Sequence, residues 1–87
     1  MGMQGADIMQ MQQLEQRLQQ ESAAVKELMQ RIDQTLSNTQ WTGPAAERFK
    51  QEWTGDFRKA LTTLSDALGQ NAATVRNRWQ AFEAAAR

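Results

Sequence analysis

The chain has 87 residues with ten basic and ten acidic side chains, a net charge of zero, and neither cysteine nor histidine. This composition excludes disulfides, the usual zinc sites and the Ser–His and Cys–His nucleophile pairs, and the balanced charge argues against nucleic acid as a partner. A mean hydropathy of −0.72 and the absence of a long apolar run predict no transmembrane segment. Residues 1–13 hold neither a basic region nor an uninterrupted apolar core, so we also expect no Sec signal peptide.

The first predicted helix runs from about residue 7 to 39, a stretch without glycine or proline. Its apolar residues recur at steps of three and four, which is a helical period, with one gap of seven across Glu21 and Ser22. Asp7 is the predicted N-cap, where its charge suits the helix N-terminus. The apolar positions are Ile8, Met11, Leu14, Leu18, Val25, Leu28, Ile32 and Leu36.

Small polar residues followed by Gly43-Pro44 end this helix and predict a turn at residues 40–43. Pro44 fits the first turn of a second helix, where its missing N–H costs nothing, with Thr42 or Gly43 as the cap. Because the connection is short, the two helices should run antiparallel. The sequence therefore predicts one all-α domain, residues 1–87, folded as a helical hairpin.

The second predicted helix runs from about residue 44 to 85 and carries an apolar stripe at the α-helical repeat. Gly55 and Gly69 lie inside it without a proline or loop residues beside them, so we expect one helix with a bend at either glycine. The stripe comprises Ala46, Phe49, Trp53, Phe57, Leu61, Leu64, Leu68, Ala72, Val75, Trp79, Phe82 and Ala86.

The apolar stripes of the two predicted helices are wider than a contact between only two helices requires. Wide stripes are typical of helices that pack against more than one neighbour. A single hairpin would leave part of the aromatic side chains in water. We therefore expect two hairpins to pack face to face into an elongated four-helix bundle. The predicted core and dimer interface comprises Leu14, Leu18, Val25, Leu28, Phe49, Trp53, Phe57, Leu61, Leu64 and Leu68.

The tripeptide Trp41-Thr42-Gly43, between two long helices in a chain of this size, resembles the WXG family of small, ESAT-like substrates of type VII secretion systems. The resemblance extends to the aromatic Phe49, eight residues after Trp41, and covers nearly the whole chain in architecture. A second copy, Trp53-Thr54-Gly55, lies within the second helical stripe, where Trp53 is expected to be a core aromatic.

The family also carries an export signal near its C-terminus, a tyrosine followed four residues later by an acid. This chain has no tyrosine, and Trp79 and Glu83 hold the same spacing. On a helix these two positions lie one above the other and form one small surface. The resemblance thus implies Trp79 and Glu83 as a signal, while the place of Trp79 on the apolar stripe favours a core or interface role. Trp41 has the same two interpretations, recognition or packing, whereas Gly43 is explained by the turn.

The resemblance implies a protein made in the cytoplasm and exported, as a folded helical dimer, by a type VII (ESX-like) system whose membrane ATPase recognises it. The second hairpin is either the chain itself or a WXG paralogue. A homodimer is favoured, because the charges balance within one chain and neither helix has a single-sign face.

Two other functions remain open on the sequence alone. One is a structural or adaptor helical bundle that stays in the cell, and the other is a membrane-active amphipathic hairpin. The mixed charge of the polar faces argues against strong attraction to anionic lipid, so we expect no stable membrane insertion. No nucleophile–base pair, metal cluster or phosphate-binding loop is present in the sequence, so we expect no enzyme activity, cofactor or metal.

Overall fold

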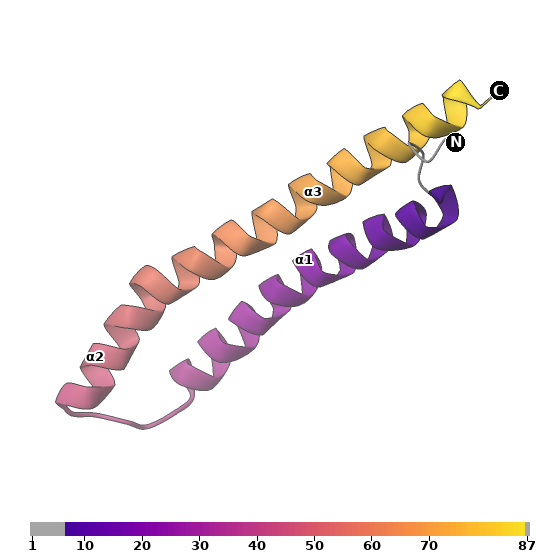
Figure 1. Cartoon of the computed structure of the whole chain (residues 1–87). Helices are drawn as coiled ribbons and strands as arrows, with labels where there is room; N and C mark the ends of the chain where they lie inside the picture. The colour runs from indigo at the N-terminus through magenta and orange to yellow at the C-terminus, as the bar shows by residue number, and fades with distance from the viewer. Residues whose placement is uncertain (1–6, 87) are drawn as a thin grey trace.

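The computed structural model describes residues 7–86, which form a long hairpin of α1 (Ile8–Ser37), α2 (Pro44–Glu52), η1 (Trp53–Phe57) and α3 (Arg58–Ala85). α1 lies alongside α3 in the antiparallel direction, and the connecting loop and α2 close one end (Figure 1). The chain measures 64 × 18 × 15 Å. The predicted all-helical hairpin is confirmed.

The N-terminal cap of α1 is the predicted one, and its C-terminal end comes earlier than the sequence suggests. The Asp7 carboxylate accepts a hydrogen bond from the backbone N–H of Gln10 at 3.1 Å. At the other end α1 stops at Ser37, two residues before the predicted end. Asn38 and Thr39, which follow, have low helix propensity, and their N–H groups still donate to the last carbonyls of the helix.

Gly43 makes the sharp entry into α2. Its φ of 112° lies in the region that side chains other than glycine rarely adopt, and its carbonyl accepts the first helical hydrogen bond, from Glu47. Pro44 follows at the first helical position, as predicted. The ammonium of Lys50 donates to the carbonyl of Trp41 at 3.4 Å, which ties the loop back onto α2.

The single second helix that the sequence predicts contains a π-helical turn, η1, over residues 53–57. The N–H of Arg58 donates to the carbonyl of Trp53, five residues earlier. Two local causes lie in this turn: Gly55 has low helix propensity, and the hydroxyl of Thr54 donates to the carbonyl of Lys50 at 2.8 Å. The wider turn spaces Trp53 and Arg58 so that both face α1. α3 then continues through Gly69 to Ala85.

The helices meet along a line that we call the hairpin seam. Its deepest positions repeat every seven residues on both sides, as in a coiled coil, but several of the residues there are polar or small. Ser65 and Ala72 are almost completely buried, and Trp53 is 4% exposed. The seam comprises Glu15, Ser22, Met29 and Asp33 on α1, and Trp53, Arg58, Ser65, Ala72 and Trp79 opposite them.

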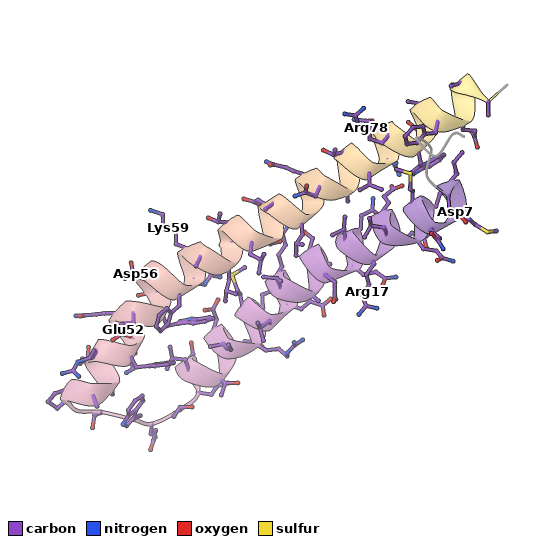
Figure 2. The ribbon with its side chains drawn as sticks, viewed as in Figure 1. Asp7, Arg17, Glu52, Asp56, Lys59 and Arg78 are labelled. Carbon is purple, nitrogen blue, oxygen red and sulfur yellow. The ribbon has the colours of Figure 1, made fainter. Side chains whose placement is uncertain are left out.

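Most of the remaining charged residues lie on the outer sides of the rod. Figure 2 shows Arg17 on α1 pointing away from α3, and Lys59 and Arg78 on α3 pointing away from α1.

Candidate functional site

At the middle of the hairpin seam, Ser22 and Ser65 join the two helices by a reciprocal pair of hydrogen bonds. The Ser22 hydroxyl donates to the Ser65 carbonyl at 2.8 Å, and the Ser65 hydroxyl donates to the Ser22 carbonyl at 2.9 Å. Ser65 is fully buried. Two serines facing each other let the helices approach closely, so Leu or Val at either position would force them apart.

Near the turn, the Asp33 carboxylate accepts hydrogen bonds from two side chains of the opposite arm. The indole N–H of Trp53 donates to it at 2.8 Å, and the Arg58 guanidinium binds both of its oxygens at 2.8–3.1 Å. The hydrogen bonds from Arg58 in the first place, and from Trp53 in the second, lower the pKa of Asp33 below its ordinary value. The hydrogen bonds to Asp33, and then its negative charge, raise the pKa of Arg58.

The opposite end of the seam repeats this arrangement with Glu15. Its carboxylate accepts from the indole N–H of Trp79 at 2.8 Å, from Arg76 at 2.9 Å and from the Gln19 amide at 3.2 Å. Glu15 is buried, while Arg76 is about half exposed. A buried carboxylate is tolerated when charged and polar donors surround it in this way.

Together these contacts form three polar layers that define how α1 and α3 are aligned. In each layer, a polar side chain of α1 needs a specific partner on the other arm. A carboxylate faces Trp and Arg in the layer near each end, and a serine faces a serine in the middle layer. A slip by one helical turn would bury each carboxylate away from its donors. The polar seam therefore specifies one register for the hairpin, a role that buried polar residues also have in coiled coils.

Beside this seam, apolar side chains from both arms form one partly exposed surface, which we call the apolar face. Two hollows lie on it, one of about 550 Å³ near the middle of the rod and one of about 310 Å³ near the turn, and they share Leu28 and Arg31. Leu28 is 39% exposed and Leu64 is 48% exposed. The apolar residues of the two hollows are Ala24, Val25, Leu28, Ile32, Leu36, Trp41, Phe49, Leu64 and Leu68.

The apolar face is longer than the two hollows. Leu14 and Leu18 continue its row along α1 at helical spacing, and Phe57 and Leu61 continue its row on the other arm. Leu14 is 49% exposed and Phe57 is 45% exposed, while Leu18 and Leu61 are half-buried. Nine of the ten predicted core and interface residues therefore lie on partly exposed rows of the rod, and the tenth, Trp53, is buried in the seam.

The chain exposes more surface than a compact protein of its size. Its accessible surface is 6679 Å², whereas the scaling for folded monomers gives about 5,200 Å² for this mass. Its radius of gyration is 19.3 Å, whereas a compact chain of this length has about 12 Å. The elongated hairpin thus has an excess of about 1,500 Å² of accessible surface over a compact chain.

The tripeptide of the family resemblance lies in the loop that joins the arms, as predicted. Trp41 is 41% exposed, and its ring packs at a tilt against Phe49, with centroids 6.0 Å apart. Both rings line the hollow near the turn. The Trp41 side chain is therefore partly exposed and packed against one other ring, and it extends the apolar face to the end of the rod.

The second predicted recognition pair lies at the other end of the same rod. Trp79 is half-buried, and its indole N–H is committed to Glu15 in the seam. Glu83 is also half-buried, one turn further along α3. Trp79 therefore contacts the first helix within the seam, and its role as a signal stays a prediction.

Sequence reasoning did not identify the polar seam, although a signal for it was present. Ser22 occupies the gap of seven in the apolar stripe of the first helix, at the step where a core residue belongs. Glu15 and Asp33 are 18 residues apart, which is five helical turns, so they lie on one side of α1. The predicted core contains neither of these two acids.

Within residues 7–86, no helix is both long and apolar enough to cross a membrane, and no cluster of three or more acidic side chains is arranged as a metal site. Comparisons with known protein families, with curated proteins and with solved structures find no match to this chain.

Proposed function

We propose that this chain is a small protein of the WXG, ESAT-like type. In this proposal two hairpins pair into an elongated four-helix bundle, which a type VII (ESX-like) secretion system exports in the folded state after its membrane ATPase recognises it. The bundle acts through protein–protein contacts and carries out no chemistry of its own. Its partner in the bundle is a second copy of the chain or a WXG paralogue.

One observation carries the proposal: the Trp41-Thr42-Gly43 tripeptide occupies the turn of a two-helix rod whose apolar face is open to solvent. Gly43 is needed there for its backbone conformation, and Trp41 has an accessible ring. The second tripeptide, Trp53-Thr54-Gly55, lies within a helix and has its tryptophan buried. The tryptophan of the first copy is therefore accessible, whereas that of the second copy is buried.

The large accessible surface of the hairpin supports the pairing part of the proposal. Covering the excess of about 1,500 Å² on each of two chains would bury about 3,000 Å², which is within the range of obligate homodimers. The apolar face that would be covered runs along both arms, as the interface of a bundle requires.

An export assay tests the proposal. The chain is produced in a bacterium with a type VII apparatus and in a strain that lacks the ATPase of that apparatus, and the secreted fraction is measured. We expect ATPase-dependent export that Trp41→Ala and Glu83→Ala both abolish, with helix content and pairing retained. The matched control is Gly55→Ala, which changes an exposed glycine of the second tripeptide alone and should be exported normally. Retention of the wild-type chain in the cell would favour the structural or adaptor role instead.

A further inference from the structure

Each arm of the hairpin carries two rows of residues that repeat every seven positions, and the seam follows only one of them. The row that faces the opposite arm, which we call the central row, comprises Glu15, Ser22 and Met29 on α1, and Arg58, Ser65, Ala72 and Trp79 on α3. The second row, which we call the side row, lies three residues further along and comprises Leu18, Val25 and Ile32 on α1, and Leu61, Leu68 and Val75 on α3. In an ordinary two-stranded coiled coil both rows face the partner helix and are apolar.

The burial of the two rows shows how the arms are turned. Glu15, Ser65 and Ala72 of the central row are buried. All six residues of the side row are only half-buried. Leu28 and Leu64, which lie beyond the side row, are more exposed still. The polar and small residues therefore lie on the contact line, and the apolar row lies beside it.

A rotation of each arm about its own axis would reverse this arrangement. Leu18 lies four residues before Ser22 and Val25 lies three residues after it, which places both about 40–60° to the same side of Ser22. The side row of α3 has the same offset from Ser65. Turning each arm by about 50° would bring the two side rows together and close the central hollow. Burial of apolar surface alone would favour this rotation.

The three polar layers oppose the rotation, because each of them needs the present facing of the arms. Rotation separates the Ser22 hydroxyl from the Ser65 carbonyl, which are 2.8 Å apart. It also withdraws the Glu15 carboxylate from the indole of Trp79, and the Asp33 carboxylate from its donors on the opposite arm. All three layers are lost together, so they hold the arms in one facing cooperatively.

We infer that Glu15, Ser22, Asp33 and Ser65 are positioning residues, which hold the arms in the facing that presents the apolar face to a partner. Without them the hairpin closes on its own side rows, and the face is used up within one chain. The polar layers and the contacts of a partner thus favour the same state. This deepens the proposed function and rests on it for the use of the face, whereas the facing of the arms is a property of the single hairpin.

A fourfold alanine variant of the full chain tests the inference: Glu15→Ala, Ser22→Ala, Asp33→Ala and Ser65→Ala. It removes the cross-arm hydrogen bonds of all three layers and introduces only the residue with the highest helix propensity. NMR NOEs report which residues of the two arms are in contact. Mixed samples of labelled and unlabelled chains separate NOEs within a chain from those between chains.

The wild type should show an NOE between Met29 and Thr62, whose Sδ and Oγ1 atoms are 3.7 Å apart. In the fourfold variant we expect this NOE to disappear and one between Leu28 and Leu64 to appear within the chain, as the central hollow closes. Circular dichroism should show the same helix content in both. If the facing that presents the apolar face falls to about a tenth of the population, the Kd of pairing rises about tenfold, which sedimentation velocity measures.

A conservative variant separates positioning from stabilisation. Glu15→Gln combined with Asp33→Asn keeps an amide oxygen as the acceptor for each indole N–H, but removes both charges. It should melt at a lower temperature than the wild type, yet keep the NOE between Met29 and Thr62 and the wild-type Kd of pairing. If the layers only stabilised the hairpin, pairing would weaken with Tm in this variant as well.

The matched control removes two acids and two neutral polar side chains from exposed positions: Glu27→Ala, Gln34→Ala, Thr63→Ala and Asp66→Ala. It should change neither the NOEs nor pairing. The inference is overturned if the fourfold variant keeps the NOE between Met29 and Thr62, gains none between Leu28 and Leu64, or loses its helix content. It is also overturned if the conservative variant shows the same change of contacts. A wild type that stays monomeric would count against the proposed pairing, while the NOE comparison would still decide the facing of the arms.

Discussion

The polar layer at Glu15 offers the sharpest test of what holds the hairpin together. Glu15→Ala removes the acceptor of the Trp79 indole N–H and the partner of Arg76, which lie 2.8 and 2.9 Å away. A hydrogen bond from a half-buried indole to a carboxylate contributes about 1.5–2 kcal/mol, and the half-exposed Arg76 adds up to about 1 kcal/mol. We therefore expect Glu15→Ala to lower the free energy of unfolding by roughly 2–3 kcal/mol.

For a domain of this size, that loss corresponds to a fall in Tm of roughly 10–20 °C. Thermal unfolding followed by circular dichroism measures it, at one fixed chain concentration because association adds to apparent stability. Glu27→Ala is the control: Glu27 lies on the same helix, is exposed, and approaches only Arg31 at 3.8 Å among the ion pairs of residues 7–86. It should cost less than about 0.5 kcal/mol. Equal Tm values for the two variants would refute the assignment of Glu15 to a stabilising buried layer.

Three further predictions concern the turn end of the rod. Hydrogen bonds from Arg58 and Trp53 lower the pKa of Asp33 in the folded state. The ionised carboxylate therefore stabilises the hairpin fully at pH values above the ordinary carboxyl pKa of about 4. This stabilisation is lost as the pH falls through the lower pKa of the folded state. Asp33→Asn should therefore destabilise the chain most near neutral pH and least at pH values below the lowered pKa of Asp33 in urea titrations, whereas a deficit independent of pH would contradict this. Gly43→Ala should lower stability by about 1–2 kcal/mol because its φ is 112°, whereas Gly55→Ala, which has open space around it, should be neutral or stabilising in the same melts. Deleting Gly55 should convert η1 into regular α-helix and leave Trp53 and Arg58 both facing Asp33, with Tm unchanged or raised; loss of cooperative melting would show that the π turn is required.

The elements of this fold were predictable because their signals are local. The absence of glycine and proline in α1, the Gly43-Pro44 step and the helical spacing of apolar residues give two helices and one turn. Asp7 and Gly43 take the predicted cap positions for the same reason. Each of these features depends on a few neighbouring residues, and none needs knowledge of what lies across the hairpin.

The register and the π turn were not predictable in this way. Whether Glu15 faces solvent or the seam depends on Trp79, which is 64 residues away in the chain. The apolar stripe predicted from the sequence lies beside the residues at which the two helices contact each other, because several of those contact residues are polar. Phe49, Trp53 and Phe57 were expected on one face, yet Trp53 is buried while Phe49 and Phe57 are partly exposed. The extra residue in η1 changes the angular positions around the helix of all residues that follow it. A prediction that assumes 3.6 residues per turn throughout the helix does not include this change.

The central claim is that one hairpin leaves an apolar face that a second hairpin must cover. Analytical ultracentrifugation of the pure chain over a dilution series, with melting curves at each concentration, tests it most directly. The account predicts a folded species of twice the 9.9 kDa chain mass and a Tm that rises with concentration. A folded monomer that melts cooperatively at the same temperature at every dilution would contradict it.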